Sequence, residues 1–272
     1  MKKLSLVLSF LIFSSAHSAL PLKVDYKKIF GEREGCFIIS DLTTGKVLDE
    51  HNPARCKKRF SPYSTFKLPA ALMAFENNVL KDEHQIIKWD GVKRRRAELN
   101  QDLTPFTFMT FSAKWVTEWI MPQLGIKTIK KYLHTFHYGN EDFSGGLKNA
   151  WVSSSLKISA HEELTFVSNF WNEKLGLSKR ATDLTKKIIF IKNLSKNTEL
   201  YGKTGTGCTA GHDCMNRPDK MFGWFVGIIK TPSNVYAVAG NASDLKDEKA
   251  PGGVRMRRAT IDIVTQMGLI TE

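Results

Sequence analysis

Residues Arg59-Phe-Ser-Pro-Tyr-Ser-Thr-Phe-Lys-Leu-Pro69 carry more information than any other stretch of this sequence. They place the hydroxyl of Ser64 three positions before the amine of Lys67, where an apolar run over residues 68–75 begins. If that run is a helix, positions i and i+3 share a face, so the amine can reach the hydroxyl and activate it as a nucleophile. The spacing alone is common, since Ser154-Ser-Leu-Lys157 has it too, and other motifs must decide.

Four further motifs follow in order, and together with the first they are typical of one class of enzyme. They are Ser112-Ala-Lys114, Tyr138-Gly-Asn-Glu-Asp-Phe-Ser-Gly-Gly146, Trp151 and Lys203-Thr-Gly205. A serine on a helix, a second serine downstream and a Lys-Thr-Gly on a late strand form the set found in serine β-lactamases and penicillin-binding proteins. With Gly223-Trp-Phe-Val-Gly227 added, the chain resembles the class D (oxacillinase-type) β-lactamases over nearly its whole mature length. The Tyr-Gly-Asn motif favours that class over class A.

The resemblance implies a catalytic set of Ser64, Lys67, Ser112 and Trp151. Ser64 is the nucleophile, and the partial positive charge at the start of its helix stabilises the oxyanion. In class D enzymes the lysine that corresponds to Lys67 reacts with carbon dioxide to give N6-carboxylysine, the general base for acylation and deacylation. Trp151 matches the tryptophan whose indole N–H holds this carbamate. Ser112 matches the serine that relays a proton to the leaving nitrogen.

The resemblance also implies how the substrate is held. Lys203 and Thr204 bind its carboxylate, Gly205 lets it approach the backbone, and the N–H groups of Ser64 and Thr206 form the oxyanion hole. A carboxylate-binding arginine is expected near the last helix. Arg255 and Arg257 both qualify, and we favour Arg257.

Lys114 departs from the family pattern, which has valine as the third member of the Ser-x-Val motif. That valine keeps water and protons away from the carboxylated lysine. A lysine here could point outward, pair with the carbamate, or hold Lys67 in its uncarboxylated state. The substitution bears on the rate of deacylation and leaves the fold and acylation unaffected.

The order of expected elements predicts an α+β fold. Residues 36–41 and 46–48 read as a hairpin, and residues 200–204, 222–230 and 235–239 as further strands. The middle of the chain, residues 68–192, has helical periodicity, and a last helix fits residues 258–267. Strands at both ends and helices between imply an antiparallel sheet flanked by helices, with an inserted all-helical lobe, which is the β-lactamase/transpeptidase-like fold. We therefore expect one catalytic domain in two lobes over residues 19–272.

The first 18 residues read as a signal peptide, with Lys2 and Lys3 before an apolar run and small residues at the cleavage site. We expect a periplasmic or secreted protein without stable membrane association. Export makes disulfides plausible, and four cysteines allow three connectivities. We favour Cys36 with Cys56 and Cys208 with Cys214, because each pair brackets a short segment next to a motif. The spacings lack the short C-x-x-C pairs of zinc sites, so no metal is expected.

The chain carries a formal net charge of +13, and its densest basic run is Lys93-Arg-Arg-Arg96. A basic run can indicate nucleic-acid binding, but export excludes that partner, and a solvated basic face is the simpler interpretation. No cofactor is expected beyond carbon dioxide or bicarbonate for Lys67. The sequence carries no signal for an oligomeric state.

The leading prediction is a serine hydrolase that opens the cyclic amide of penicillin-type antibiotics and so contributes to antibiotic resistance. The alternative is a penicillin-binding, sensor-like protein that is acylated but turns over poorly. A cell-wall transpeptidase is disfavoured by the small size and the lack of a membrane anchor.

Overall fold

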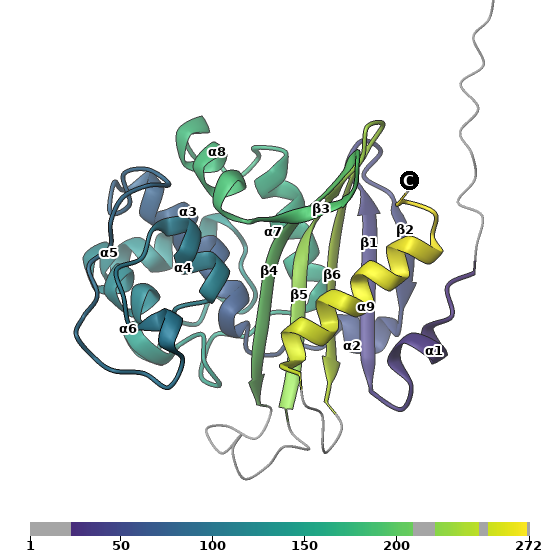
Figure 1. Ribbon diagram of the computed structural model, residues 1–272, viewed down its shortest axis with the longest axis horizontal. Coiled ribbons are helices and arrows are strands. Elements are labelled where there is room, and N and C mark those ends of the chain that lie inside the picture. Colours follow the sequence, from purple (N-terminus) through teal and green to yellow (C-terminus); the bar gives the residue numbers. More distant parts are fainter. Residues whose placement is uncertain (1–22, 209–220, 245–249, 271–272) are drawn as a thin grey trace, which may run out of the picture.

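A single antiparallel sheet runs through the middle of the protein (Figure 1). The computed structural model describes residues 23–208, 221–244 and 250–270. Within them the strand order is β2-β1-β6-β5-β4-β3. The strands are β1 (Gly35–Asp41), β2 (Val47–His51), β3 (Phe190–Ser195), β4 (Thr198–Cys208), β5 (Met221–Lys230) and β6 (Val235–Ser243).

The two ends of the chain meet in this sheet, as the sequence predicts. The hairpin of β1 and β2 joins the late strands where β1 pairs with β6, with Phe37 opposite Gly240 and Ser40 opposite Ala237. The α+β fold with an antiparallel sheet is therefore confirmed.

Helices cover both faces of the sheet, and one group forms a separate lobe beside it (Figure 1). The short α1 (Tyr26–Phe30) and the long α9 (Gly252–Gln266) lie on one face. The other helices are α2 (Pro53–Lys57), η1 (Tyr63–Phe66), α3 (Lys67–Glu76), η2 (Ala97–Leu99), α4 (Pro105–Phe111), α5 (Lys114–Thr135), α6 (Gly146–Asn149), α7 (Ala160–Trp171) and α8 (Lys179–Ile188). Of these, α7 packs against β6, β1 and β5, and α3 packs against α5 and α8.

The two faces of the sheet bury different hydrophobic clusters, because successive side chains of a strand point to opposite sides. On β5, Val226 and Ile228 belong to the cluster shared with the helical lobe, whereas Phe225 and Ile229 belong to the cluster under α9. Both sides of β5 are therefore core, and its residues 222–229 are all buried.

The elements differ from the predicted ones in three places. Residues 190–195 form the edge strand β3, although the helical pattern was expected to continue to residue 192. The last helix begins at Gly252, six residues before the predicted start at 258, because its first turn packs tightly against β5 at Gly223. Ser64 lies in the 3₁₀ turn η1 and not in the α-helix that follows it.

The predicted Cys36–Cys56 disulfide is not formed in this structure. Cys36 on β1 and Cys56 on α2 are fully buried free thiols that face each other. The hydrogen bond between the two thiols, together with burial, raises the pKa of Cys56. Cys208 is also a buried free thiol, and its predicted partner Cys214 lies outside the described residues, as does the predicted signal peptide.

No helix in the described ranges is long and apolar enough to cross a membrane.

Candidate active site

The Ser64 hydroxyl and the Lys67 amine meet at the start of α3. We call residues 62–66, which include η1, the serine turn. Lys67 Nζ lies 3.1 Å from Ser64 Oγ. A 3₁₀ turn brings side chains at i and i+3 into line, which accounts for this contact. Ser64 is half-buried and therefore accessible, whereas Lys67 is only 1% exposed.

The surroundings of Lys67 favour its neutral amine. Burial holds its pKa well below the usual range, and the positive charges of Lys203 and Lys114 lower it further. Glu118 raises this pKa and Arg96 lowers it, both by smaller amounts. A buried lysine without a proton can take one from a neighbouring hydroxyl, which is the property required of a general base.

Strand β4 lies directly against the serine turn. A Cβ atom on Gly205 would meet the carbonyl oxygen of Pro62, so a larger residue cannot replace this glycine without moving the turn. The hydroxyl of Thr206 accepts a hydrogen bond of 2.9 Å from the N–H of Gly253 at the start of α9. Ser64 and Thr206, whose N–H groups are the predicted oxyanion hole, thus lie on two segments that pack together.

Tyr63 joins these segments, a role that no sequence motif had indicated. Its hydroxyl hydrogen-bonds the carbonyl oxygen of Cys208, accepts from the Cys208 N–H at 3.0 Å and lies 2.8 Å from Ser153 Oγ. Its backbone has φ of 52°, in the left-handed region that is costly for a bulky residue. A strained tyrosine therefore fixes the backbone directly before the nucleophile.

The predicted carboxylate-binding residues gather at the edge of β4. Lys203 is 4% exposed, and its Nζ lies 3.1 Å from the carbonyl oxygen of Thr204. Burial, followed by the charges of Arg257 and Arg96, lowers the pKa of Lys203 to about 7. Burial also lowers the pKa of Arg257. The site is therefore short of negative charge and suited to an anion.

The structure separates the two candidate arginines. Arg257 lines a cavity of about 440 Å³ together with Lys203 and Thr204, and Phe106, Met109 and Ile261 form apolar parts of its wall. Arg255 instead forms an ion pair with Asp244 at the end of β6. This geometry favours Arg257 as the residue that meets a substrate carboxylate.

Ser112 and Lys114 lie at the junction of α4 and α5. Ser112 caps the end of α4 with φ of 56° and ψ of 41°, a left-handed conformation that is uncommon for serine. Lys114 forms an ion pair with Glu118 one helical turn further along α5. Lys114 therefore has a carboxylate partner, although its charge still acts on Lys67.

Trp151 is buried against the serine turn. Its ring stacks on Phe66 with a centroid distance of 5.2 Å and an interplanar angle of 17°, and Phe143 stacks with it at 6.1 Å. The carbonyl oxygen of Trp151 accepts a hydrogen bond of 2.9 Å from the N–H of Tyr63. The segment that carries Trp151 is thus anchored both to the turn and to its aromatic neighbours.

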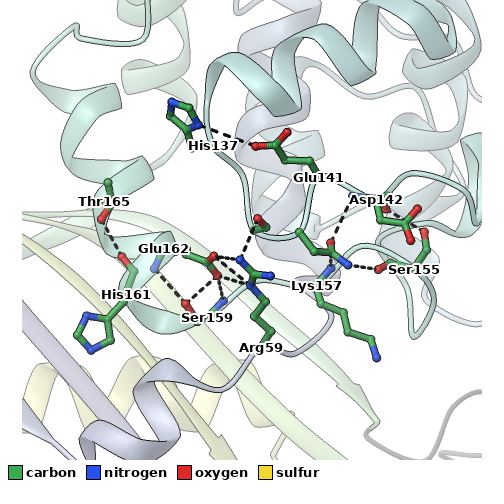
Figure 2. A network of polar contacts seen from close by, with 12 residues as sticks. Arg59, His137, Glu141, Asp142, Ser155, Lys157, Ser159, His161, Glu162 and Thr165 are labelled. Atoms are coloured by element: carbon green, nitrogen blue, oxygen red, sulfur yellow. Dashed lines mark hydrogen bonds and ion pairs between the residues drawn. The ribbon is translucent and has the colours of Figure 1, made fainter.

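Asn140 of the Tyr-Gly-Asn motif holds this same segment from the other side. Its Nδ2 donates to the carbonyl oxygen of Ser155 at 2.8 Å, and its Oδ1 accepts from the N–H of Lys157 at 2.9 Å. Figure 2 labels Ser155 and Lys157, whose backbone groups make these hydrogen bonds. Gly139 has φ of 61°, and a Cβ atom there would collide with the Lys157 carbonyl oxygen. Gly139 and Asn140 therefore act as a clamp on residues 155–157.

Arg59 connects the clamp to α7 (Figure 2). Its guanidinium pairs with Glu162 and donates to the carbonyl oxygen of Gly139 at 3.3 Å. Glu162 also caps its own helix by accepting from the N–H of Ser159 at 2.9 Å. One carboxylate thereby joins the start of α7 to the chain that leads into the serine turn.

Arg96 is a second residue whose role the sequence did not reveal. The basic run at residues 93–96 was expected to be a solvated face, yet the charge of Arg96 lowers the pKa of both Lys67 and Lys203. Arg96 also pairs with Glu98 at 2.8 Å. Only the tertiary structure brings this loop to the site, so no local pattern could have identified it.

Among the described residues, no group of three or more histidine, cysteine, aspartate or glutamate side chains could hold a metal ion.

Comparison with known proteins finds relatives over nearly the whole chain. Residues 35–260 match the family model described as the penicillin binding protein transpeptidase domain. The chain is 34% identical over 275 residues to the β-lactamase OXA-1 of Escherichia coli, an alignment that covers 97% of this chain and 96% of that protein. It is 35% identical over 249 residues to the probable β-lactamase YbxI of Bacillus subtilis (strain 168), covering 92% and 86%.

Solved structures and a larger protein give the same result. A crystal structure of a class D β-lactamase from Bacillus subtilis superposes with a TM-score of 0.81 at 34% identity, over 92% of this chain and 98% of that one. The methicillin resistance mecR1 protein of Staphylococcus aureus is 33% identical over 254 residues, which cover 91% of this chain but only 41% of that protein.

Proposed function

The chain belongs to the class D β-lactamases, and from this membership we propose how its residues open a β-lactam ring. As Ser64 Oγ attacks the lactam carbonyl carbon, the base at Lys67 takes the hydroxyl proton. The carbon–nitrogen bond of the ring then breaks, and Ser112 relays the proton from the base at Lys67 to the leaving nitrogen, which frees the base to accept a proton again. A water molecule that gives its proton to the same base attacks the resulting ester, which releases the ring-opened acid and restores Ser64.

One observation carries this proposal, the distance of 3.1 Å between Lys67 Nζ and Ser64 Oγ in a buried site. We expect that Ser64→Ala abolishes covalent labelling by a penicillin. Lys67→Ala is expected to retain the nucleophile and to lose about 10²–10⁴-fold in rate, the usual cost of removing a general base. Intact-protein mass spectrometry after incubation with a penicillin measures both. A penicilloyl adduct on the Ser64→Ala protein would refute the assignment.

We further propose that the base is the N6-carboxylated form of Lys67. Carboxylation requires a neutral amine and supplies a negatively charged proton acceptor. The charges of Lys203, Lys114 and Arg96 favour that neutral amine, and they would also stabilise the charge of the product. Burial of Lys67 and the stacked Phe66 and Trp151 rings supply the apolar setting. Carbon-13 NMR of protein equilibrated with labelled bicarbonate tests this, with Lys67→Ala as the control that must lack the carbamate signal.

Lys114 tunes this equilibrium in our proposal. Its positive charge favours carboxylation, but it occupies the position at which the family has a water-excluding valine, and 45% of its side chain is exposed. Because the loss of water exclusion opposes carboxylation, we propose that turnover depends on bicarbonate more than in a relative with valine.

For the carboxylate of the substrate we propose Lys203, Thr204 and Arg257 as the binding residues, with Gly205 leaving room beside β4. The oxyanion would lie between the N–H groups of Ser64 and Thr206. The cavity lined by Lys203, Thr204 and Arg257 supports the proposed position of the substrate carboxylate.

The alternative is a protein that is acylated and then releases the product slowly, as a sensor would. Turnover separates the two. A chromogenic β-lactam should yield many equivalents of product per protein from an enzyme, and a single equivalent from a sensor.

We propose that residues 1–18 direct export and are removed, which would place the protein in the periplasm or outside the cell. The charged start, the apolar run and the small residues before Ala19 support this. The mass of the protein recovered from a periplasmic extract tests it, since a retained leader would leave the full-length mass.

A further inference from the structure

Glu163 is a buried carboxyl group that the chemistry above does not use. It lies in the first turn of α7 and is only 1% exposed. Its Oε1 lies 2.7 Å from Thr65 Oγ1 and 3.1 Å from the Tyr138 hydroxyl. Thr65 directly follows the nucleophile Ser64, so the carboxyl group contacts the serine turn from behind.

The contacts around Thr65 require three hydrogen atoms. Besides its contact with Glu163, Thr65 Oγ1 lies 2.8 Å from the carbonyl oxygen of Pro62, within the same turn. If Glu163 is neutral, Tyr138 donates to Glu163, Glu163 donates to Thr65, and Thr65 donates to Pro62, so every contact holds one hydrogen. If Glu163 is ionised, Thr65 has a single hydrogen for two acceptors. One link of the chain is then lost.

We propose that Glu163 is a positioning residue for the reaction at Ser64, and that its neutral carboxyl group holds the serine turn in its reactive shape through Thr65 and Tyr138. This inference rests on the proposed role of Ser64 as the nucleophile. Glu163 makes none of the described contacts with Ser64 itself, so its effect passes through the Thr65 hydroxyl and the Pro62 carbonyl.

The groups around Glu163 make the neutral form available near neutral pH. Burial raises the pKa of Glu163 to about 7, the hydrogen bonds from Thr65 and Tyr138 lower it, and the charge of Glu162 raises it. Glu162 faces away toward Arg59, with which it pairs. A carboxylic acid is neutral below its pKa, so the three-hydrogen chain is complete below about pH 7 and broken above it.

In the described part of the chain, charged groups on the two helices packed against α7 have other partners, since Arg55 of α2 pairs with Glu34 and Lys186 of α8 pairs with Glu173. On the serine turn side, the amine of Lys67 is directed at Ser64 Oγ. The strands β1, β5 and β6 beneath α7 contribute buried apolar residues such as Ile38, Val226 and Ala239 to the same core. Tyr138 is fully buried, and burial raises its pKa well above the usual range, so it stays a hydrogen-bond donor at neutral pH.

The test compares single-turnover acylation of Ser64 by a penicillin in the full-length protein and its variants, between about pH 6 and about pH 8.5. Glu163→Gln is the informative variant, because its amide N–H can donate to Thr65 and cannot ionise. Glu163→Ala removes the link at every pH. Glu162→Gln is the matched control, because it neutralises the adjacent carboxyl group that does not contact Thr65. The titrations of Lys67 and Lys203 are common to all variants, so the ratio of each rate to that of the wild type removes them.

We expect the ratio of Glu163→Gln to wild type to be near one at low pH and to rise about tenfold across neutral pH, as expected when a small misplacement is corrected. Glu163→Ala should be about tenfold slower than wild type at low pH. A ratio for Glu163→Gln that is constant with pH would overturn the proposal, as would an equal pH step in Glu162→Gln. If Glu163→Ala fails to fold, the glutamine variant alone decides. If the wild type is not labelled at any pH, the proposed function fails with it, whereas labelling with a constant ratio refutes the positioning role alone.

Discussion

Lys203 makes the pH dependence of substrate capture predictable. Its pKa of about 7 lies far below the ordinary value of 10.5, because the side chain is buried and Arg257 and Arg96 add positive charge. Only the ammonium form can pair with a substrate carboxylate. Above pH 7 the fraction of Lys203 in the ammonium form falls about tenfold per pH unit. This corresponds to a loss of about 1.4 kcal/mol in the free energy of substrate binding per pH unit. Since kcat/KM reports the ionisations of the free enzyme, it should fall with that slope on the alkaline side.

The variant Lys203→Arg keeps a positive charge at every accessible pH. We expect the alkaline fall in kcat/KM to disappear in this variant, even if its value at pH 7 is lower because the longer guanidinium fits less well. Arg257→Gln should act differently. It removes a neighbouring cation, so the pKa of Lys203 rises and the alkaline fall moves to higher pH, while overall capture weakens.

The assay is kcat/KM of a penicillin between about pH 6 and about pH 9 at a fixed, high bicarbonate concentration. A penicillin methyl ester serves as the matched control, because it has no carboxylate for Lys203 to hold. Its profile should lack the alkaline fall in the wild type as well. A wild-type kcat/KM for the free acid that stays level to about pH 9 would contradict the role of Lys203. So would a kcat/KM of the Lys203→Arg variant that falls with the same slope as that of the wild type.

Three other changes have definite expected outcomes. Lys114→Val should reduce the dependence of turnover on added bicarbonate, measured in degassed buffer, and an unchanged dependence would show that the exposed Lys114–Glu118 pair does not act on Lys67. Gly139→Ala should lower the free energy of unfolding in urea by more than about 2 kcal/mol, because it combines left-handed strain with a collision at the Lys157 carbonyl. Its control, Gly146→Ala, has φ of 83° but open space around the added methyl and should cost only about 1–2 kcal/mol, so equal losses would contradict the clamp. The thiols of Cys36 and Cys56 should resist a thiol reagent in the native protein, because both are fully buried, and react once urea unfolds it; if neither reacts after unfolding, they are oxidised.

Local patterns in the sequence predicted those elements that bury a regular face. Strands β4, β5 and β6 contain short runs rich in β-branched and aromatic residues, and their existence was correctly predicted. Strand β3 was missed because Phe190–Ser195 is short and partly exposed, and only its pairing with β4 stabilises it as a strand. The sequence indicated a helix at Ser64, but the left-handed Tyr63 next to it reflects contacts with Cys208 and Ser153 that no local pattern contains.

The same limit applies to the candidate site. The spacing of Ser64 and Lys67 was enough to predict their contact, because it depends on one turn of helix. The ion pair of Arg255 with Asp244 joins two different parts of the fold, so no local pattern in the sequence could have indicated it. Glu163 precedes an apolar helical pattern and looks like an ordinary charged residue at a helix start. It is buried only because Thr65 and Tyr138, nearly a hundred and about twenty-five positions away, are brought to it.

The pairing of β1 with β6 determines when this protein can fold. Gly35 of β1 lies opposite Ala242 of β6, so these neighbouring strands come from distant parts of the sequence. A nascent chain that ends before β6 leaves β1 and β2 as an isolated hairpin, and such a hairpin is barely stable in water. Long-range pairing of this kind also makes folding slow, because the chain must lose the entropy of closing the intervening loop before the strand contacts can stabilise it. The sheet therefore cannot be completed until β6 is available. Removing residues 235–243 would separate β1 and β2 from the other strands.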